Sequence, residues 1–345
     1  MQRSCLLYYP TPSPGVVGQM GPWRLGQMKG VFLDLDTVSH DGDVKLRPLE
    51  KVLSVLRVFG TTTADQVLQH VADAEVLIAN KVKLPADLVK RLPAVRLISI
   101  AATGVNNVDL AAAWDRKIGV CNVPAYSTAA VAQHTFALIL ALNQHLKGYE
   151  ALLREGAWKR APQFTLLDFP IHELHGRKLG IIGYGHIGKA VAKLGEAFGM
   201  QVLVAARNRE DKRPGRRLLE ELLPQADVLS IHVPIVAETR GLIGPKELVL
   251  MKHDAILINT SRGGIVDEVA LAAVLRARRL GGAGIDVLSE EPPIHGNPLL
   301  DPAIPNLIVT PHVAWASREA RQRVVEEMAL NIAAFQQGDM RNRVA

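Results

Sequence analysis

Three polar residues follow apolar segments in the C-terminal third of the chain: Arg262 in INTSRGG, Glu291 in DVLSEEPP and His312 in IVTPHVAW. A guanidinium can hold a carboxylate through two parallel hydrogen bonds, and an imidazole can give or take a proton near neutral pH. A carboxylate beside that imidazole would orient it and stabilise its protonated form. Together these residue types indicate a site that binds a small carboxylic acid and moves a proton on it.

A glycine-rich turn lies in the segment KLGIIGYGHIGKAVAKLGEAFGMQVLVAA. An apolar strand leads into Gly183, Gly185 and Gly188, and a helical pattern and a second apolar strand follow them. Gly183 would allow the tight turn, Gly185 the approach of a pyrophosphate, and Gly188 the close packing of helix on strand. Because the free N–H groups of the helix N-terminus would face that anion, this unit predicts a dinucleotide-binding site.

The elements that must position these residues follow from alternating patterns. From residue 30 to 123, the apolar runs VFLDL, AEVLIAN, VRLISIAA and IGVCNV alternate with helix-like segments at 48–58, 85–92 and 109–116. A second series follows in KLGIIG, MQVLVAA, DVLSIHV, AILINT, GAGIDV and LIVTPH. The alternation predicts an α/β fold with two doubly wound parallel sheets, whose strand ends form the ligand crevices.

The changes of pattern also suggest domain boundaries. We expect residues 1–29 to form a disordered extension, because they contain four prolines, no Asp or Glu, and no periodicity; an upstream or misassigned start is the simplest explanation for them. Residues 30–126 and 315–345, the latter including a helix at 315–337, would form one domain, and residues 127–314 the dinucleotide-binding domain. The helical pattern at 128–149 is long and apolar, which predicts packing between domains or subunits.

Composition and charge exclude several classes of function. With 345 residues, 48% of them hydrophobic, the chain can bury two cores, but no apolar run reaches the roughly 18 to 20 residues of a membrane span. Cys5 and Cys121 suggest neither a disulfide framework nor a metal site, and favour a reducing, cytoplasmic setting. The net charge of +6 is dispersed and accompanies no nucleic-acid-binding motif, so we expect no nucleic-acid partner.

Several segments together resemble the D-isomer-specific 2-hydroxyacid dehydrogenase family, from residue 30 to the C-terminus. They are AATGVNNVDL, GYGHIG, INTSRGGIVDE, GIDVLSEEP and VTPHVAW. Within the family the sequence is most similar to bacterial glycerate dehydrogenases, or hydroxypyruvate reductases, through ANKVKL, VAQHTFALILAL and LLDFPIHELHG. The resemblance implies a flavodoxin-like substrate domain, a Rossmann dinucleotide-binding domain and a homodimer.

The resemblance also implies an activity, the NAD(P)H-dependent reduction of a small 2-oxo acid to the D-2-hydroxy acid. Hydroxypyruvate to D-glycerate is the best single expectation, with glyoxylate to glycolate as a side or main activity. His312 would protonate the carbonyl oxygen, Glu291 would hydrogen-bond His312, and Arg262 would bind the substrate carboxylate. Backbone N–H groups of Thr103 and Gly104 would bind the same carboxylate from the other domain.

The remaining residues implied by the family line the dinucleotide. Asp286 would meet the nicotinamide carboxamide. The others that would line the cofactor are His186, Ile187, His232, Thr260 and Ser261. Formate dehydrogenases pair their histidine with glutamine, so the carboxylate of Glu291 disfavours that branch, and the chain ends too soon after 315–337 for the C-terminal regulatory domain of many phosphoglycerate dehydrogenases.

One position departs from the pattern of NAD-preferring relatives, whose second strand ends in an acidic residue that binds the adenosine ribose. That position is Ala206, and residues 207–217, RNREDKRPGRR, hold six basic and two acidic side chains. Arg207 and Asn208, with Arg209, would bind a 2′-phosphate, so the sequence favours NADP over NAD.

Two alternatives to that cofactor interpretation stay open. Glu210 or Asp211 folds back onto the ribose, or the basic residues form a solvated loop.

Alternatives to the enzyme as a whole also stay open. The family's transcriptional corepressors retain the same catalytic residues, so a dinucleotide-dependent binding protein remains the alternative to an enzyme. A catalytically silent homologue is a third possibility, although all three residues of the triad are present. The absence of a long low-complexity interaction segment favours the enzyme.

Overall fold

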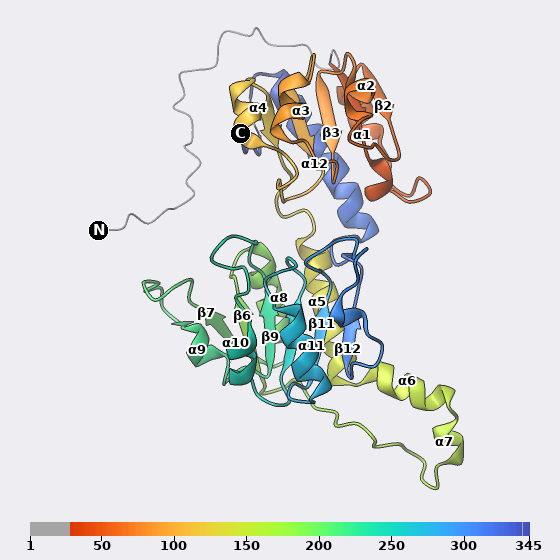
Figure 1. The fold of residues 1–345 in the computed structure, drawn as a ribbon, viewed down its shortest axis with the longest axis vertical. Coiled ribbons are helices and arrows are strands. Elements are labelled where there is room, and N and C mark those ends of the chain that lie inside the picture. Colours follow the sequence, from red (N-terminus) through yellow and green to blue (C-terminus); the bar gives the residue numbers. More distant parts are fainter. Residues whose placement is uncertain (1–27, 340) are drawn as a thin grey trace. The chain divides into compact units, whose positions relative to one another are not determined.

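A computed structural model describes residues 28–339 and 341–345 of the chain. The chain forms two compact units: the first runs to Tyr126 and resumes at Arg318, and the second comprises Ser127–Ser317. Each unit contains one parallel sheet with helices on its faces (Figure 1). The predicted α/β fold with two parallel-sheet domains is thereby confirmed. The predicted N-terminal extension lies outside the described residues, except for Met28, which is buried, and Lys29, which begins the first strand.

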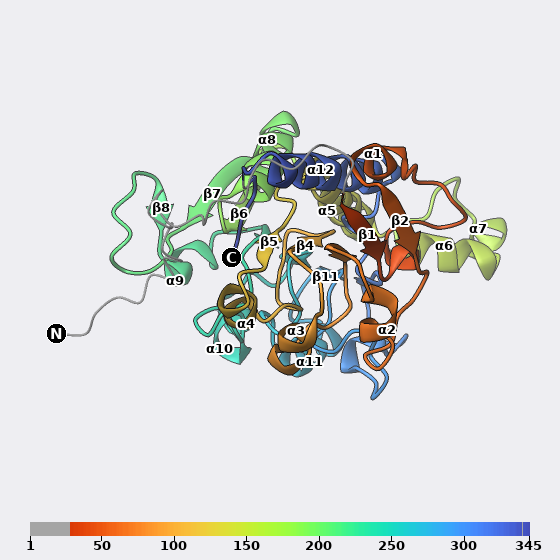
Figure 2. The same ribbon diagram turned by 90° about the horizontal axis from the view of Figure 1, so that it is seen from above.

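The first unit holds a five-stranded sheet in the order β2-β1-β3-β4-β5, which is the flavodoxin-like order. Its strands are β1 (Lys29–Phe32), β2 (Val55–Val58), β3 (Val76–Ala79), β4 (Leu97–Ile100) and β5 (Gly119–Cys121). Its helices are η1 (Leu35–Thr37), α1 (Arg47–Val52), α2 (Val67–Val71), α3 (Ala86–Arg91), α4 (Leu110–Asp115) and α12 (Arg318–Gln336). Figure 2 shows α1 and α12 on one face of the sheet and α2, α3 and α4 on the other. Both β3 and β4 are buried throughout because helices cover both faces.

The prediction of a helix at 48–58 is wrong for the second half of that segment. Helix α1 ends at Val52, and Val55–Val58 form β2 at the edge of the sheet, paired with β1. The four residues VLRV form no long apolar run, since an edge strand exposes part of both faces. The sequence pattern therefore predicted a longer helix, whereas pairing with β1 makes Val55–Val58 a strand.

The second unit holds a seven-stranded sheet in the order β12-β11-β10-β9-β6-β7-β8. Its strands are β6 (Lys178–Ile182), β7 (Gln201–Ala205), β8 (Arg216–Arg217), β9 (Val228–Ile231), β10 (Ile256–Asn259), β11 (Gly282–Ile285) and β12 (Leu307–Val309). Its helices are α5 (Thr128–Asn143), α6 (Leu146–Arg154), α7 (Ala157–Arg160), α8 (His186–Ala197), α9 (Leu219–Leu222), α10 (Pro245–Leu250), α11 (Glu268–Arg276) and η2 (Pro298–Leu300). Strands β6 to β11 follow the Rossmann order, with the topological switch between β6 and β9. Of the strands in this second sheet, the sequence patterns missed β8, a two-residue edge strand.

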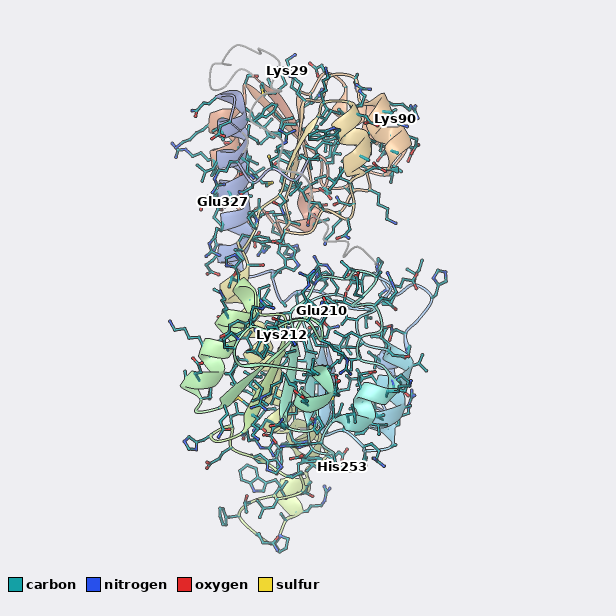
Figure 3. All side chains as sticks on the ribbon, turned by 90° about the vertical axis from the view of Figure 1, so that its left-hand side faces the viewer. Lys29, Lys90, Glu210, Lys212, His253 and Glu327 are labelled. Carbon is teal, nitrogen blue, oxygen red and sulfur yellow. The ribbon has the colours of Figure 1, made fainter. Side chains whose placement is uncertain are left out.

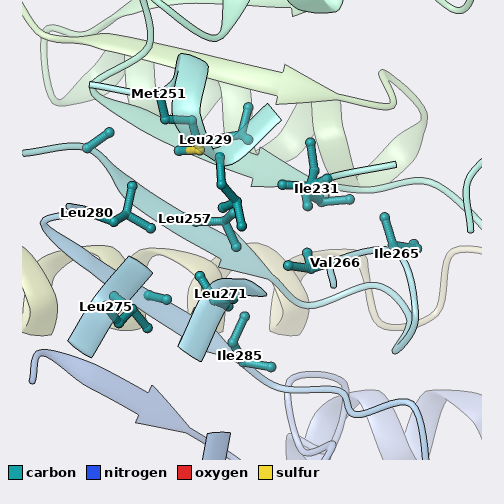
Figure 4. Close-up of a cluster of buried hydrophobic side chains, with 14 of the residues drawn as sticks. Leu229, Ile231, Met251, Leu257, Ile265, Val266, Leu271, Leu275, Leu280 and Ile285 are labelled. Carbon is teal, nitrogen blue, oxygen red and sulfur yellow. The ribbon is translucent and has the colours of Figure 1, made fainter. Parts of the chain in front are cut away.

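Apolar side chains pack on both faces of this second sheet. One face is covered by α5 and α8, and the other by the helices that include α10 and α11. The close-up in Figure 4 shows part of the second face, where strand residues pack against α11. The strand residues are Leu229, Ile231, Leu257 and Ile285, and the residues of α11 are Leu271 and Leu275. The sheet is therefore a rigid base for the loops at its carboxyl edge.

The prediction of a single helix at 128–149 is also wrong, because two helices form there. Helix α5 ends at Asn143, His145 adopts a left-handed conformation with φ of 49°, and α6 starts at Leu146. Helix α5 packs against α8, β10 and β11 within its own unit. Burial inside the unit thus contributes to its apolar composition, and the expected packing between domains or subunits stays a prediction. In the described part of the chain, no helix is long and apolar enough to cross a membrane.

Candidate active site

The three polar residues that opened the sequence analysis follow neighbouring strands. Arg262 comes after β10, Glu291 after β11 and His312 after β12, and these strands are adjacent in the sheet. Because the strands are parallel, their carboxyl ends lie at one edge, where open α/β sheets bind their ligands. The topology therefore brings the three loops together.

The imidazole of His312 and the carboxylate of Glu291 form a direct pair. Nδ1 of His312 lies 2.7 Å from Oε2 of Glu291, and the other carboxylate oxygen accepts the backbone N–H of Leu288 at 2.9 Å. The side chain of His312 is 25% exposed, so its ring can still reach a small ligand. With Nδ1 bound to the carboxylate, Nε2 is the nitrogen left to exchange a proton.

The turn that carries His312 is held by Asp286 at the end of β11. The Asp286 carboxylate accepts hydrogen bonds from Thr310 Oγ1 at 2.6 Å and from the backbone N–H groups of Val313 and Ala314, both at 2.9 Å. Its side chain is 0% exposed. His312 itself has a φ of 54°, an uncommon conformation for a residue other than glycine. The structure thus gives Asp286 a positioning role, and its contact with a nicotinamide stays a prediction.

A second contact fixes the same turn from the other side. The indole N–H of Trp315 donates to the backbone carbonyl of His312 at 2.9 Å. The sequence analysis missed Thr310, although a hydroxyl two residues before His312 was visible in IVTPH. Its hydroxyl lies 3.1 Å from Nε2 of His134 on α5, which ties the turn to the helix beneath it.

Asn259, at the end of β10, shapes the turn that carries Arg262. Its side-chain oxygen accepts from Ser261 N at 3.1 Å and Ser261 Oγ at 2.8 Å, and its amide group donates to the carbonyl of Arg262 at 2.9 Å. Asn259 is buried, and the sequence analysis did not select it; a polar residue ending the apolar run AILIN was the available signal. No ion pair among the described residues involves Arg262, so its guanidinium can take an anion.

Gly263 brings the loop of Arg262 against the loop of Glu291. A side chain built on Gly263 would overlap the backbone carbonyl of Leu288 and the nitrogen of Ser289. Leu288 in turn donates its N–H to Glu291. A continuous series of contacts therefore runs from Arg262 through the glycine to Glu291 and His312.

The glycine-rich turn after β6 has open space at one position and close packing at two. A Cβ at Gly183 would overlap the carbonyl oxygen of His232, and one at Gly188 would overlap the carbonyl of Gly183. At Gly185, the residue before α8, a Cβ would meet no atom within 4 Å. The backbone is therefore open at Gly185, directly before α8, and the binding of a pyrophosphate by the N–H groups of His186 and Ile187 stays a prediction.

His232 follows β9, beside this turn. Its Nε2 lies 2.8 Å from Ser230 Oγ. Burial of the imidazole by surrounding protein lowers the pKa of His232 to about 3, so the ring is neutral at pH 7. Directly after β10, the hydroxyl of Thr260 lies 3.2 Å from the hydroxyl of Thr135. The predicted dinucleotide residues His232, Thr260 and Ser261 thus follow adjacent strands on one side of the glycine turn.

The loop between β7 and β8 carries the basic residues 207–217. Asp211 accepts the backbone N–H of Arg207 at 2.9 Å and binds the guanidinium of Arg213 at 2.6 and 2.7 Å. The Arg213 guanidinium, followed by the Arg207 N–H, holds the pKa of Asp211 well below its usual range. Asp211 is therefore already engaged, which disfavours its folding back onto a ribose.

The other charges of this loop divide into paired and unpaired ones. Arg209 forms an ion pair with Glu220 of α9. Arg207 and Asn208 are exposed at the end of β7, and no carboxylate of the described residues pairs with Arg207. Glu210 is exposed, and Figure 3 labels it with Lys212 in this loop. The structure thus leaves Glu210 as the one acidic side chain of the loop without an assigned ion pair.

Thr103 and Gly104 lie in the first unit, in the loop after β4. The hydroxyl of Thr103 donates to the carbonyl of Val123 at 2.8 Å, and the amide of Asn122 donates to the carbonyl of Thr103 at 2.7 Å. These contacts hold the loop, and the backbone N–H of Gly104 donates no hydrogen bond to any of the described residues. The role of both residues toward a substrate stays a prediction.

Buried Asp34 organises the neighbouring strand ends, a role that the sequence analysis did not foresee. Its carboxylate accepts the backbone N–H groups of Asn80, Lys81 and Val82 at 2.6 to 3.1 Å. Asn107 donates to the carbonyl of Val82 at 2.9 Å and so joins the loop after β3 to that after β4.

The geometry agrees with comparisons to known proteins. Residues 136–314 match the family model described as D-isomer specific 2-hydroxyacid dehydrogenase, NAD binding domain. A glycerate dehydrogenase of Methylorubrum extorquens is 42% identical over 316 residues, which cover 92% of this chain and 98% of that protein. The chain belongs to the D-isomer specific 2-hydroxyacid dehydrogenase family.

Two further similarities support the assignment of this dehydrogenase. A hydroxypyruvate reductase of Blautia hydrogenotrophica is 35% identical over 323 residues, covering 92% of this chain and 99% of that protein. The crystal structure of a D-lactate dehydrogenase from Aquifex aeolicus, complexed with NAD and lactic acid, superposes with a TM-score of 0.75 at 32% identity, over 90% of this chain and 96% of that one. The protein is an NAD(P)-dependent D-2-hydroxyacid dehydrogenase acting on CH–OH groups. Across the described residues, no cluster of His, Cys, Asp and Glu is arranged to hold a metal ion.

Proposed function

We propose that this dehydrogenase reduces hydroxypyruvate to D-glycerate, with glyoxylate to glycolate as a second activity. The observation that carries the proposal is the pair of His312 and Glu291, 2.7 Å apart, on loops that follow strands adjacent to that of Arg262. The guanidinium of Arg262 donates to the carbonyl of Ser261 at 2.7 Å and forms no ion pair among the described residues. Similar proteins named glycerate dehydrogenase, hydroxypyruvate reductase and glyoxylate reductase support the choice of substrate.

In the proposed reaction, the guanidinium of Arg262 binds the substrate carboxylate and polarises the adjacent carbonyl group. The binding of a substrate carboxylate by the N–H groups of Thr103 and Gly104 stays a prediction from the sequence. Protonated His312 donates its Nε2 proton to the carbonyl oxygen as the alcohol forms, and it accepts that proton in the reverse direction. The Glu291 carboxylate stabilises the imidazolium before transfer. The glycine-rich turn and the N-terminus of α8 would hold the pyrophosphate of a bound cofactor, whose reduced nicotinamide would supply the hydride.

We propose the two units as the substrate domain, residues 30–126 and 315–345, and the dinucleotide domain, residues 127–314. We further propose a cytoplasmic enzyme with no nucleic-acid partner. The free, buried thiol of Cys121 supports a reducing compartment, because disulfides form and persist mainly in oxidising compartments.

For the cofactor, we propose a preference for NADP over NAD. Ala206 offers no carboxylate to the ribose, Asp211 is occupied by Arg213, and Arg207 has no acidic partner among the described residues. Arg207 and Asn208 would therefore bind the 2′-phosphate. Glu210 remains the group through which an NAD preference would arise.

Exchange of Arg207 for aspartate tests this preference. In Arg207→Asp, we expect kcat/KM with NADPH to fall roughly 10- to 150-fold, because a charge-assisted hydrogen bond to the phosphate is lost. The value with NADH should change little. Initial rates with both cofactors measure the ratio, and an unmoved NADPH/NADH ratio would show that Arg207 does not contact the phosphate.

We propose that the enzyme is a homodimer. Helices α6 and α7 and the segment after them extend beyond the sheet of their unit (Figure 1) and expose large apolar side chains. Six of them are at least 48% exposed: Leu146, Leu153, Trp158, Phe164, Leu167 and Ile171. Such a group of exposed apolar side chains is typical of a protein–protein interface.

Polar substitutions in the segment after α7 should produce a monomeric variant. In the double variant Phe164→Ser and Leu167→Ser, we expect a monomer mass by light scattering at micromolar concentration, where the wild type should be a dimer. Val249→Ser with Val269→Ser is the matched control, since those valines are 68% and 71% exposed in the same unit. A wild-type monomer, or the same loss in both double variants, would contradict the proposed interface.

The function itself is tested by initial rates of hydroxypyruvate reduction at pH 7, with NADPH and NADH side by side. Turnover with either cofactor, exceeding that for branched 2-oxo acids, is the expected result. Failure to reduce hydroxypyruvate or glyoxylate would refute the proposed substrate and return attention to a dinucleotide-dependent binding protein.

A further inference from the structure

We propose that Arg216, on the edge strand β8, is a second residue that recognises the 2′-phosphate of NADP, held in place by the ring of Tyr184. This inference rests on the proposed preference for NADP. The guanidinium carbon of Arg216 lies 4.9 Å from the centre of the Tyr184 ring. Tyr184 is the residue between the first two glycines of the glycine-rich turn.

The sheet order shows where the Arg216 guanidinium must lie. Tyr184 follows β6, Arg216 is on β8, and β7 lies between these two strands. To reach the tyrosine ring, the arginine side chain has to pass over the carboxyl end of β7. Ala206 is at that end, and it occupies the position where NAD-binding units carry the carboxylate that binds the ribose.

The pairing register places both side chains on one face. Arg216 is in register with Val204 in the parallel ladder, so their side chains point to the same side of the sheet. Ala206 continues the ladder through its N–H bond to the carbonyl of Arg217 at 2.7 Å, and it lies two residues after Val204. Arg216 and residue 206 therefore share a face, whereas Arg217 points to the opposite one.

The charges of the loop separate Arg216 from its neighbours. Arg209 and Arg213 are neutralised by Glu220 and Asp211. In the described residues, no carboxylate forms an ion pair with Arg216, which is half-buried over the tyrosine ring. An aromatic ring holds a guanidinium without cancelling its charge, so the cation stays available to a phosphate. The methyl group of Ala206 leaves room for that phosphate.

Binding of adenosine 2′,5′-bisphosphate and of 5′-AMP tests the inference without turnover. We expect wild type to bind the bisphosphate more tightly, and Arg216→Met to reduce that preference at least 10-fold while its Kd for 5′-AMP stays within about twofold. Arg217→Met is the matched control, because it removes the same charge one residue away on the other face. Equal loss for both nucleotides in Arg216→Met, or an unchanged ratio, would overturn the inference.

Two variants test the support given by the ring. Tyr184→Phe keeps the ring and should keep the nucleotide preference, whereas Tyr184→Leu removes the ring and should lower the preference in the same direction as Arg216→Met. An unchanged preference in Tyr184→Leu would overturn the role of the ring. If wild type itself does not prefer the bisphosphate, the NADP proposal fails as a whole. If wild type prefers it and Arg216→Met leaves this preference unchanged, only the inference about Arg216 fails. Neither outcome decides whether the enzyme reduces hydroxypyruvate, which the initial-rate experiment tests separately.

Discussion

Replacement of His312 by glutamine is expected to lower kcat for 2-oxo acid reduction at pH 7 by roughly 10²- to 10⁴-fold, the range that a general acid contributes. Glutamine keeps a polar side chain of similar length but cannot deliver a proton from a charged ring. The residues predicted to bind the dinucleotide follow other strands, so the Kd for the reduced cofactor should stay within about twofold of wild type. Single-turnover rates and fluorescence titration measure the two quantities.

The structure supplies a matched control for this variant. His295 forms a pair with Glu290 at 2.6 Å, close to the 2.7 Å of His312 with Glu291, but the His295 side chain is 80% exposed. His295→Gln should therefore leave kcat unchanged. If the two variants lost activity to the same degree, or if His312→Gln kept full activity, the proton-transfer role of His312 would be wrong.

The second large effect is expected from Gly263→Ala. The added methyl group would overlap the backbone of Leu288 and Ser289, which no side-chain rotation can relieve. The loop of Arg262 or that of Glu291 must then move, and a displacement of about 1 Å near reacting groups can cost about 100-fold in rate. We expect kcat/KM for the 2-oxo acid to fall about 100-fold while the Kd for the dinucleotide changes little.

Gly244→Ala is the control for this substitution. At Gly244 a Cβ would meet only the end of the Glu247 side chain at 3.3 Å and a carbonyl oxygen at 3.6 Å, so the change should be tolerated. Circular dichroism and the midpoint of thermal unfolding should show that Gly263→Ala is folded. Wild-type kcat/KM in a folded Gly263→Ala protein would show that the contact between the two loops does not position the site.

The site depends on groups that do not react. Asp286 binds three donors of the His312 turn, and Asn259 binds both sides of the Arg262 turn. Both are buried polar side chains whose hydrogen bonds are satisfied locally, which fixes the geometry of loops that would otherwise be mobile. The reacting residues are therefore held by strand-end residues of the same sheet.

Sequence alone determined the architecture of this dehydrogenase and selected the candidate catalytic residues, whose roles stay predictions. Buried parallel strands read as apolar runs of four to six residues, and the glycine turn is a local motif, so both are visible without tertiary contacts. Arg262, Glu291 and His312 were recognisable because polar residues directly after such runs must lie at one edge of the sheet.

Only the tertiary structure decided features that depend on pairing between distant segments. The edge strands β2 and β8 lack apolar runs, since an edge strand is stabilised by its neighbour and not by burial of its own side chains. The break at His145, the overlap that requires Gly263, and the commitment of Asp211 to Arg213 each depend on atoms brought close by folding. The position of Arg216 over Tyr184 is of the same kind, because it follows from strand order, which no single segment of the sequence encodes.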